Sequence, residues 1–521
     1  MQTQTQPASV PRDMLAGTIV FLVALPLCLG IANASGVDPL AGLMSGMIGG
    51  LVVALLSGSQ LSVSGPAAGL VVIVVDGIAK LGGFSAFLMA VLLSGVLQFA
   101  FGMLRAGRFA AYVPSSVIKG MLAAIGLLLI IKQVPLAFGF ARGDAAAAAV
   151  GALVTPFGTV SPAAMAVTAL SVAVLTGWET RALRRFLLVR ALPAPLVVVA
   201  LGIGVTLLLD AVAPGFAAPV EHRVGLPSLA SFGALFDALQ SPSLDALTNP
   251  DVWQLAVALA IVASLETLLS LEAVEQIDPK KRTAPADREL KAQGIGNMMA
   301  GAFGALPITS VIVRSSANVQ AGAQSRWSAV MHGALLLASV FTLTSIVNLI
   351  PLACLATILI FTGFKLAKPS LFVSVARQGR ERFAPFMVTI VGVLLTDLLI
   401  GILMGIALSI ALAIRANLRR SIVMARHHDH VLLSFRKDVS FMSKVPLKRC
   451  LAQVPDYTTL IIDASRADYI DPDVRELVER FIEDAPSRGI LIERHHFDPV
   501  APQPAQASKP SKLRFSRCAT R

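Results

Sequence analysis

Arg314 places a guanidinium inside a stretch of otherwise membrane-like sequence, LPITSVIVRSSANVQAG at 306–322. Burying a charge within a membrane is costly, so an intramembrane arginine indicates a functional site. Pro307 cannot donate a hydrogen bond to a helix, and the hydroxyls of Thr309 and Ser310 can line a polar cavity. This pattern predicts a helix that begins within the membrane and directs its N-terminus at an anion. A polar helix contact or a buried ion pair is the alternative.

Glu266 is a second charged residue within an apolar run, AIVASLETLLSLEAVEQIDP. Ser270 follows it at the i+4 position and therefore lies on the same helix face. A carboxylate beside a hydroxyl is suited to hold Na⁺, and a buried carboxyl group can instead hold H⁺. A structural ion pair between Glu266 and Arg314 explains the same two charges. The residues alone leave both roles open, and the two are not exclusive.

A stretch in the first half of the chain, SVSGPAAG at 62–69, is similar in character to the stretch around Arg314. Its glycines and alanines allow close approach of backbones, and a helix that begins after Pro66 would present free N–H groups. Two such helix N-termini facing one another, with Arg314 adding a full charge, would bind an anion. Tight helix crossing by small residues is the alternative.

Composition places these stretches in a polytopic membrane protein. The chain has 521 residues, is 55% hydrophobic and only 14% charged, and has a mean hydropathy of +0.75. Its net charge of +12 comes from basic residues between the apolar segments and at the C-terminus, which indicates topology and argues against a nucleic-acid partner. No nucleophile–base pair, metal-ligand spacing or nucleotide motif is visible, so we predict no enzymatic activity and no cofactor beyond a transported Na⁺.

Apolar runs predict about fourteen transmembrane segments, seven on each side of a polar connection. They lie at 14–33, 39–57, 62–78, 86–104, 114–133, 161–178, 193–210, 251–274, 290–306, 308–322, 326–348, 351–366, 384–397 and 399–416. The predicted divisions are a cytoplasmic N-terminus (1–13), a first transmembrane repeat (14–210), an extracytoplasmic connection (211–250) and a second repeat (251–420).

The placement of charges predicts the orientation of the chain in the membrane, and similarity between the two halves predicts an internal repeat. Basic residues concentrate in alternate loops, which predicts that both termini are cytoplasmic in the cell inner (cytoplasmic) membrane. Pro66 and Pro307 are each followed, one long helix later, by a further proline-led apolar segment. With an odd number of segments in each half, the second repeat would be inverted relative to the first, as in secondary transporters.

The composition changes from residue 429 onward. Alternating strand and helix patterns at 429–496 predict a small soluble α/β domain, with strands at VLLSF, DVSFM, TLIIDAS and GILIERH. The Pro-rich, basic segment at 499–521 is predicted to be disordered.

Three segments resemble the signature segments of SulP anion transporters, the bacterial relatives of the SLC26 carriers. They are ELKAQGIGNMMAGAFGALP at 289–307, RSSANVQAGA at 314–323 and SVSGPAAG at 62–69. The resemblance covers about 12–420, and 429–496 is similar to a shortened STAS domain, with DASRADYID at the position of that family's strand-to-helix loop.

The resemblance implies an all-α membrane fold of two inverted repeats of seven segments, arranged as core and gate domains, and a homodimer surrounded by membrane lipid. The anion would lie between the N-termini of the third and tenth segments, and Na⁺ or H⁺ would be held on the eighth segment by Glu266 and Ser270. The implied anion-binding residues are Leu27, Ser64, Gly65, Pro66, Ala67, Thr309, Ser310, Val313 and Arg314.

Two of these positions depart from the family pattern. Many members carry a glutamine after the first-segment proline and an aromatic residue after the Gly-Pro pair, whereas here Leu27 and Ala67 occupy those positions. The pocket is therefore expected to be roomier and less polar. We predict coupled transport of a small anion, bicarbonate first and sulfate second. The alternatives are a nucleobase permease of the same fold and a non-transporting anion sensor or motor that signals through the STAS-like domain.

Overall fold

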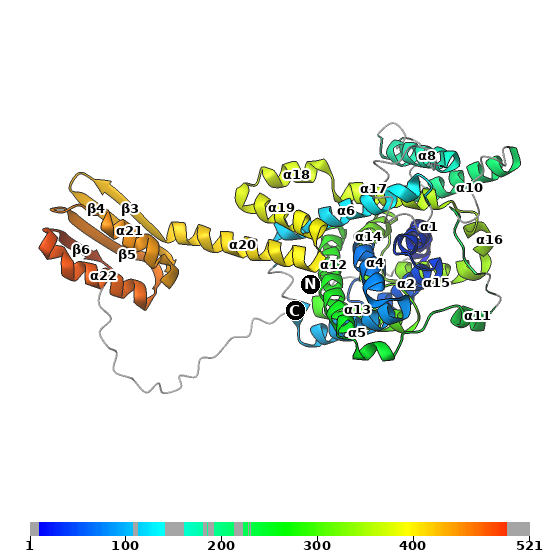
Figure 1. Ribbon diagram of the computed structural model, residues 1–521, viewed down its shortest axis with the longest axis horizontal. Helices are drawn as coiled ribbons and strands as arrows, with labels where there is room; N and C mark the ends of the chain where they lie inside the picture. The colour runs from blue at the N-terminus through cyan, green and yellow to red at the C-terminus, as the bar shows by residue number, and fades with distance from the viewer. Residues whose placement is uncertain are drawn as a thin grey trace. The chain divides into compact units, whose positions relative to one another are not determined.

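The structure is a computed structural model that describes residues 10–107, 113–140, 161–180, 192–212, 222–227 and 231–497 apart from 397, together with 185 and 229. The chain forms two compact units, Met1–Ser409 and Ile410–Arg521, which are described separately (Figure 1). The tail predicted at 499–521 and most of the predicted N-terminus lie outside the described residues.

The first half of the membrane unit contains long apolar helices and one interrupted segment. In chain order these are α1 (Val10–Ala34), α2 (Pro39–Ile48), the π-turn η1 (Gly49–Val53), α3 (Ala54–Leu56), β1 (Ser64–Pro66), the 3₁₀ turn η2 (Ala68–Leu70), α4 (Val71–Leu81), α5 (Phe84–Met103), α6 (Ser115–Ala137), α8 (Pro162–Glu179) and α10 (Ala194–Val212). Asp38 caps α2 by accepting a 2.7 Å hydrogen bond from the Leu40 N–H, with Pro39 in the first turn.

The second half repeats this arrangement after a connection that holds α11 (Phe232–Asp237) and the turn η8 (Asp245–Thr248). Its elements are α12 (Pro250–Ile277), α13 (Ala286–Ala302), β2 (Ile308–Ser310), α14 (Ile312–Gln320), α15 (Trp327–Thr342), α16 (Thr344–Val347), α17 (Leu352–Leu366), α18 (Pro369–Ala376), α19 (Arg380–Leu395) and α20 (Leu398–Ser421).

Each of the fourteen predicted segments coincides with one or more helices, or with a short strand followed by a helix, in the described chain. Within the described residues, nine helical stretches are long and apolar enough to span a membrane, and α15 is a shorter apolar helix. The segments at 62–78 and 308–322 differ from the expectation of helix alone. Each begins with a short strand that leads into a half-length helix, so the membrane unit is not entirely helical.

The packing of the helices repeats between the two halves, as inverted repeats require. α1 packs against α15 and α14, and its counterpart α12 packs against α5 and α4. Likewise α2 contacts α15 as α13 contacts α5, and α6 contacts α19 as α17 contacts α8. Replacing each helix in these contacts by its counterpart in the other half therefore gives a contact that is also present. Elements α1–α5 and α12–α15 form one group, and α6, α8, α10, α17 and α19 form a second.

Small residues allow the closest of these contacts, between α5 and α13. A Cβ on Gly95 would lie 2.4 Å from the Met298 nitrogen, and one on Gly294 would lie 2.5 Å from the Phe99 nitrogen. The run GIGNMMAG at 294–301 therefore serves helix packing and is not a nucleotide motif.

The second unit is a four-stranded sheet with the order β3-β4-β5-β6. β3 (Ile422–His427) and β4 (His430–Val439) are antiparallel, while β4, β5 (Thr459–Ile470) and β6 (Leu491–His495) run parallel. The crossovers carry α21 (Lys444–Ala452) and α22 (Pro472–Asp484), which pack against one another. This is the expected small STAS-like α/β domain.

Three local features of this domain differ from the predictions. The sheet begins at Ile422, ahead of residue 429, because β3 pairs along its whole length with β4. The predicted strands VLLSF and DVSFM overlap one irregular strand, β4, which ends at Val439. The segment 463–471, expected as a loop, continues β5 to Ile470, and its Ser465 N–H donates a 2.9 Å hydrogen bond to Asp463.

Candidate functional site

The two interrupted segments meet directly, because β1 and β2 form an antiparallel pair. Ser64 lies opposite Ser310, Gly65 opposite Thr309, and Pro66 opposite Ile308. Each strand leads into a half-helix, α4 after β1 and α14 after β2, and neither helix has a side-chain N-cap. The first-turn N–H groups of α14 are therefore available to a ligand, whereas the Val71 N–H at the start of α4 already donates to the Ala68 carbonyl of the turn η2.

Arg314 is in the first turn of α14, and its side chain reaches the backbone of β1. A Cβ built on Gly65 would lie 2.1 Å from Nη1 of Arg314. No side chain larger than hydrogen fits at that position without moving the guanidinium. Gly65 of SVSGPAAG thus leaves room for the guanidinium of the other repeat.

The Arg314 guanidinium is fully buried, with 0% exposure, and none of its three nitrogen atoms has an oxygen or nitrogen hydrogen-bond partner among the described residues. The Cys28 thiol and the His332 imidazole are close enough to interact with its charge. A buried cation without a counter-charge is strongly unfavourable. An anionic ligand would supply the missing partner.

A buried polar scaffold that the sequence reasoning missed holds the strand pair in place. Asn297 in α13 accepts a 2.6 Å hydrogen bond from the Ile308 N–H and donates a 3.0 Å bond to the Ile308 carbonyl. The same amide donates to Gln98 in α5, and Gln293 donates a 2.7 Å bond to the hydroxyl of Ser64. Gln293 and Asn297 in the run QGIGN could have indicated this scaffold from the sequence, since amides inside an apolar run need buried partners.

The second candidate charge, Glu266 in α12, lies beside the turn that leads into α4. A Cβ on Gly69 would lie 2.9 Å from Oε2 and 3.0 Å from Oε1 of Glu266. Oε2 is buried and has no hydrogen-bond partner in the part of the chain that the structure describes. Ser270 is also buried, one turn along the same helix, with no contact to Glu266 among the hydrogen bonds of the described residues.

Glu266 and Arg314 do not form an ion pair among the described residues, so the structural-pair alternative is not observed. The arginine approaches β1 at Gly65, whereas the glutamate approaches the following turn at Gly69. The two charges therefore occupy separate positions along the same first-repeat segment. That separation suits two ligands of opposite charge.

The remaining predicted site residues fall into two groups. Ser64, Pro66, Ala67, Thr309 and Ser310 are buried in or beside the strand pair, and the Thr309 hydroxyl has no partner among the described residues. Leu27 is buried in α1, directly before Cys28, while Val313 is 37% exposed on α14 and is not part of this buried group.

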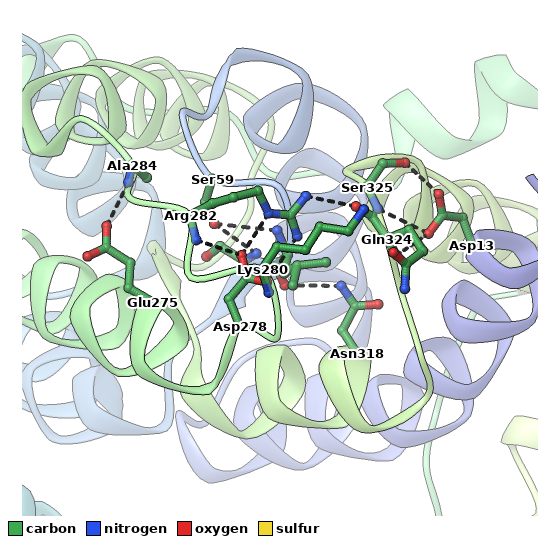
Figure 2. A network of polar contacts seen from close by, with 12 residues as sticks. Asp13, Ser59, Glu275, Asp278, Lys280, Arg282, Ala284, Asn318, Gln324 and Ser325 are labelled. Carbon is green, nitrogen blue, oxygen red and sulfur yellow. Dashed lines mark hydrogen bonds and ion pairs between the residues drawn. The ribbon is translucent and has the colours of Figure 1, made fainter. Parts of the chain in front are cut away.

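A network of polar contacts supports the ends of the same elements (Figure 2). Asp13 at the start of α1 accepts hydrogen bonds from the backbone N–H groups of Gln324 and Ser325, which precede α15. Arg282, after α12, pairs with Asp278 at 2.7 Å and donates a 2.9 Å bond to the Gln324 carbonyl. The network therefore ties the start of α1 to the α12–α13 connection and the α14–α15 connection.

Fold and site together define a multi-pass membrane protein with two inverted repeats whose half-helices meet at a buried cation. Residues 11–389 match the Sulfate permease family, and the chain belongs to that family.

Relatives agree with this assignment. The chain is 27% identical over 392 residues to the "Putative sulfate transporter YvdB" of Bacillus subtilis, covering 75% of this chain and 71% of that protein. It is 24% identical over 401 residues to the "Bicarbonate transporter BicA" of Picosynechococcus, covering 75% and 67%. The fold is similar to that of the murine Slc26a9 anion transporter in the inward-facing state, with a TM-score of 0.73, 17% identity, and coverage of 94% and 86%.

Proposed function

We propose that the protein is a secondary active transporter of a small anion, with bicarbonate as the first candidate and sulfate as the second. The observation that carries this proposal is the fully buried guanidinium of Arg314, whose nitrogen atoms have no oxygen or nitrogen partner among the described residues, at the start of α14 and against β1. Helix N-termini carry partial positive charge, so the guanidinium and the start of α14 attract an anion to the same place.

The choice of bicarbonate follows from relatives and from the pocket's composition. A bicarbonate transporter and a putative sulfate transporter are both among the relatives of this chain. Leu27 and Ala67 add no polar groups to the site, so the donors that would hold the anion are backbone N–H groups, Arg314 and the Thr309 hydroxyl. Such a site favours a weakly hydrated monoanion over a dianion, because a dianion is costlier to desolvate.

Coupling is assigned to Glu266, with Ser270 one turn away on α12. The carboxylate of Glu266, whose Oε2 is buried without a hydrogen-bond partner among the described residues, is stabilised when it takes up a proton or binds Na⁺. Because Glu266 lies against Gly69 in the turn before α4, cation binding acts on the segment that also lies against Arg314 at Gly65. The cation is cargo here, transported together with the anion.

The site is better suited to an anion than to a nucleobase, since a neutral base needs no buried arginine. We further propose that both termini are cytoplasmic, that the protein lies in the inner membrane, and that it forms homodimers.

Liposome uptake tests the function. Reconstituted protein should accumulate labelled bicarbonate or sulfate under an imposed Na⁺ or H⁺ gradient. Binding without uptake would instead support the sensor alternative.

A further inference from the structure

His332 is a further buried polar group of the membrane unit that has no partner among the described residues. It lies in α15, has 0% exposure, and neither ring nitrogen has a hydrogen-bond partner among the described residues. Buried polar atoms in folded proteins are nearly always paired with protein, water or ligand. The imidazole is therefore expected to have a partner that is not part of the chain.

The face of α15 that carries His332 is directed at the surroundings of Arg314. Leu336 is one turn from His332, and its Cδ1 lies 2.6 Å from where a Cβ on Gly46 would be. The Cβ position on Gly46 is also 2.9 Å from Cys28 Sγ and 4.0 Å from Arg314 Nη1, so Leu336 lies near both of these side chains. The charge of the guanidinium also acts on the imidazole itself. Two buried groups that lack partners thus face a common region.

The chemistry of the two groups differs in a way that distinguishes ligands. Arg314 offers only hydrogen-bond donors, whereas a neutral imidazole has one donor and one acceptor nitrogen. A ligand that satisfies both groups carries acceptor oxygens and one O–H. Bicarbonate has this pattern, while chloride, nitrate and sulfate offer acceptors alone.

We propose that His332 contacts the bound anion together with Arg314 and selects oxyanions that carry a proton. This inference rests on the proposed anion transport and deepens it by naming a residue that determines specificity. The acceptor nitrogen of His332 receives the O–H of the anion, and the guanidinium donates to its other oxygens. Chloride can accept a hydrogen bond from the guanidinium, but it has no O–H to donate to the acceptor nitrogen of His332.

The test compares His332→Leu, which removes both ring nitrogens, with His332→Gln, which keeps a donor and an acceptor. Inhibition constants for bicarbonate, chloride, nitrate and sulfate are measured by competition against labelled substrate in proteoliposomes. His332→Leu should weaken bicarbonate about tenfold, the effect of losing roughly one buried hydrogen bond. Chloride and nitrate should change little, and His332→Gln should retain most of the preference for bicarbonate.

Equal weakening of all anions, or unchanged selectivity in His332→Leu, would overturn the inference. If neither variant folds, thermal stabilisation of the wild-type protein decides. Bicarbonate must then raise the melting temperature at lower concentration than chloride or sulfate, and the reverse order contradicts the role of His332. Failure of the proposed function is distinguishable, because the wild-type protein would then transport none of these anions.

Discussion

Gly65 and Arg314 lie so close together that a Cβ on the glycine would be 2.1 Å from Nη1 of the arginine. The two residues belong to different repeats and are joined through the antiparallel pair of β1 and β2. The buried cation of the second repeat is thus positioned by the backbone of the first. A change at Gly65 is therefore expected to change the space open to the guanidinium.

Gly65→Ala tests this relationship directly. The added methyl group must push the guanidinium away from β1, so anion affinity should fall by about tenfold or more, equivalent to roughly 1.4 kcal/mol. Competition binding in detergent or liposomes measures this change. Gly204→Ala is the matched control, because a Cβ there meets nothing within 4 Å. Unchanged affinity in folded Gly65→Ala would show that Arg314 does not contact the anion.

Glu266→Gln should separate coupling from anion binding. The amide keeps the size of the side chain but can neither hold Na⁺ strongly nor take up a proton. Gradient-driven uptake should therefore fall at least about tenfold while anion exchange persists, an effect of the size expected for a buried charged contact. Uptake and exchange are measured in the same proteoliposomes, and equal loss of both would point to a structural role.

Gly69→Ala offers a second route to the same site. The new methyl group would lie 2.9 Å from Oε2 of Glu266 and displaces the carboxylate without changing its charge. The affinity of the protein for the coupling cation should fall. Coupled uptake would then need a higher Na⁺ or H⁺ concentration to reach its half-maximal rate. An unaltered cation dependence would contradict the placement of the coupling ion beside this turn.

Asn297→Leu should destabilise the membrane unit. It leaves the N–H and C=O of Ile308 unpaired and removes a bond to Gln98. Each buried group without a partner costs about 1–3 kcal/mol, so the melting temperature in detergent should fall markedly. Ser94→Ala is the control, because among the described residues the Ser94 hydroxyl bonds to the Val91 carbonyl of its own helix alone. Equal melting temperatures for the two variants would refute the scaffold.

Asp278 gives the network of Figure 2 a defined pH dependence. Burial raises the pKa of Asp278, but hydrogen bonds from the Arg282 side chain and the Lys280 N–H outweigh burial and hold the pKa below its usual range. A lowered folded-state pKa stabilises the protein above the unfolded-state value of about 3.9, and this contribution is lost as the pH falls through the folded-state pKa. Asp278→Asn should therefore lower the melting temperature at pH 7, with the difference narrowing below about pH 4. A constant difference across this range would exclude the ionised carboxylate as the cause.

Much of the fold follows from the sequence because membranes impose strong rules on apolar length and on charge placement. Pro66 and Pro307 predicted the two interrupted helices, and the chain indeed begins both half-helices shortly after these prolines. The strands before them were not predicted, since three-residue strands leave no periodicity to detect.

The site was only partly predictable for a different reason. Arg314 and Glu266 stand out as charges in apolar runs, but their separation depends on contacts with Gly65 and Gly69, far away in the chain. The Asn297–Gln98 bond likewise joins residues 199 positions apart. Single-sequence patterns carry no information on such pairs, because they report local periodicity only.

The central claim is that Arg314 at the meeting point of the two repeats binds an anion that the protein transports. The most direct measurement is uptake of labelled bicarbonate and sulfate into proteoliposomes under imposed Na⁺ and H⁺ gradients, with wild-type protein and Arg314→Ala side by side. We expect saturable, gradient-dependent uptake by the wild-type protein and loss of at least about tenfold in apparent affinity in the folded variant. Equal uptake by both proteins, or no uptake of either anion by the wild-type protein, would contradict the account.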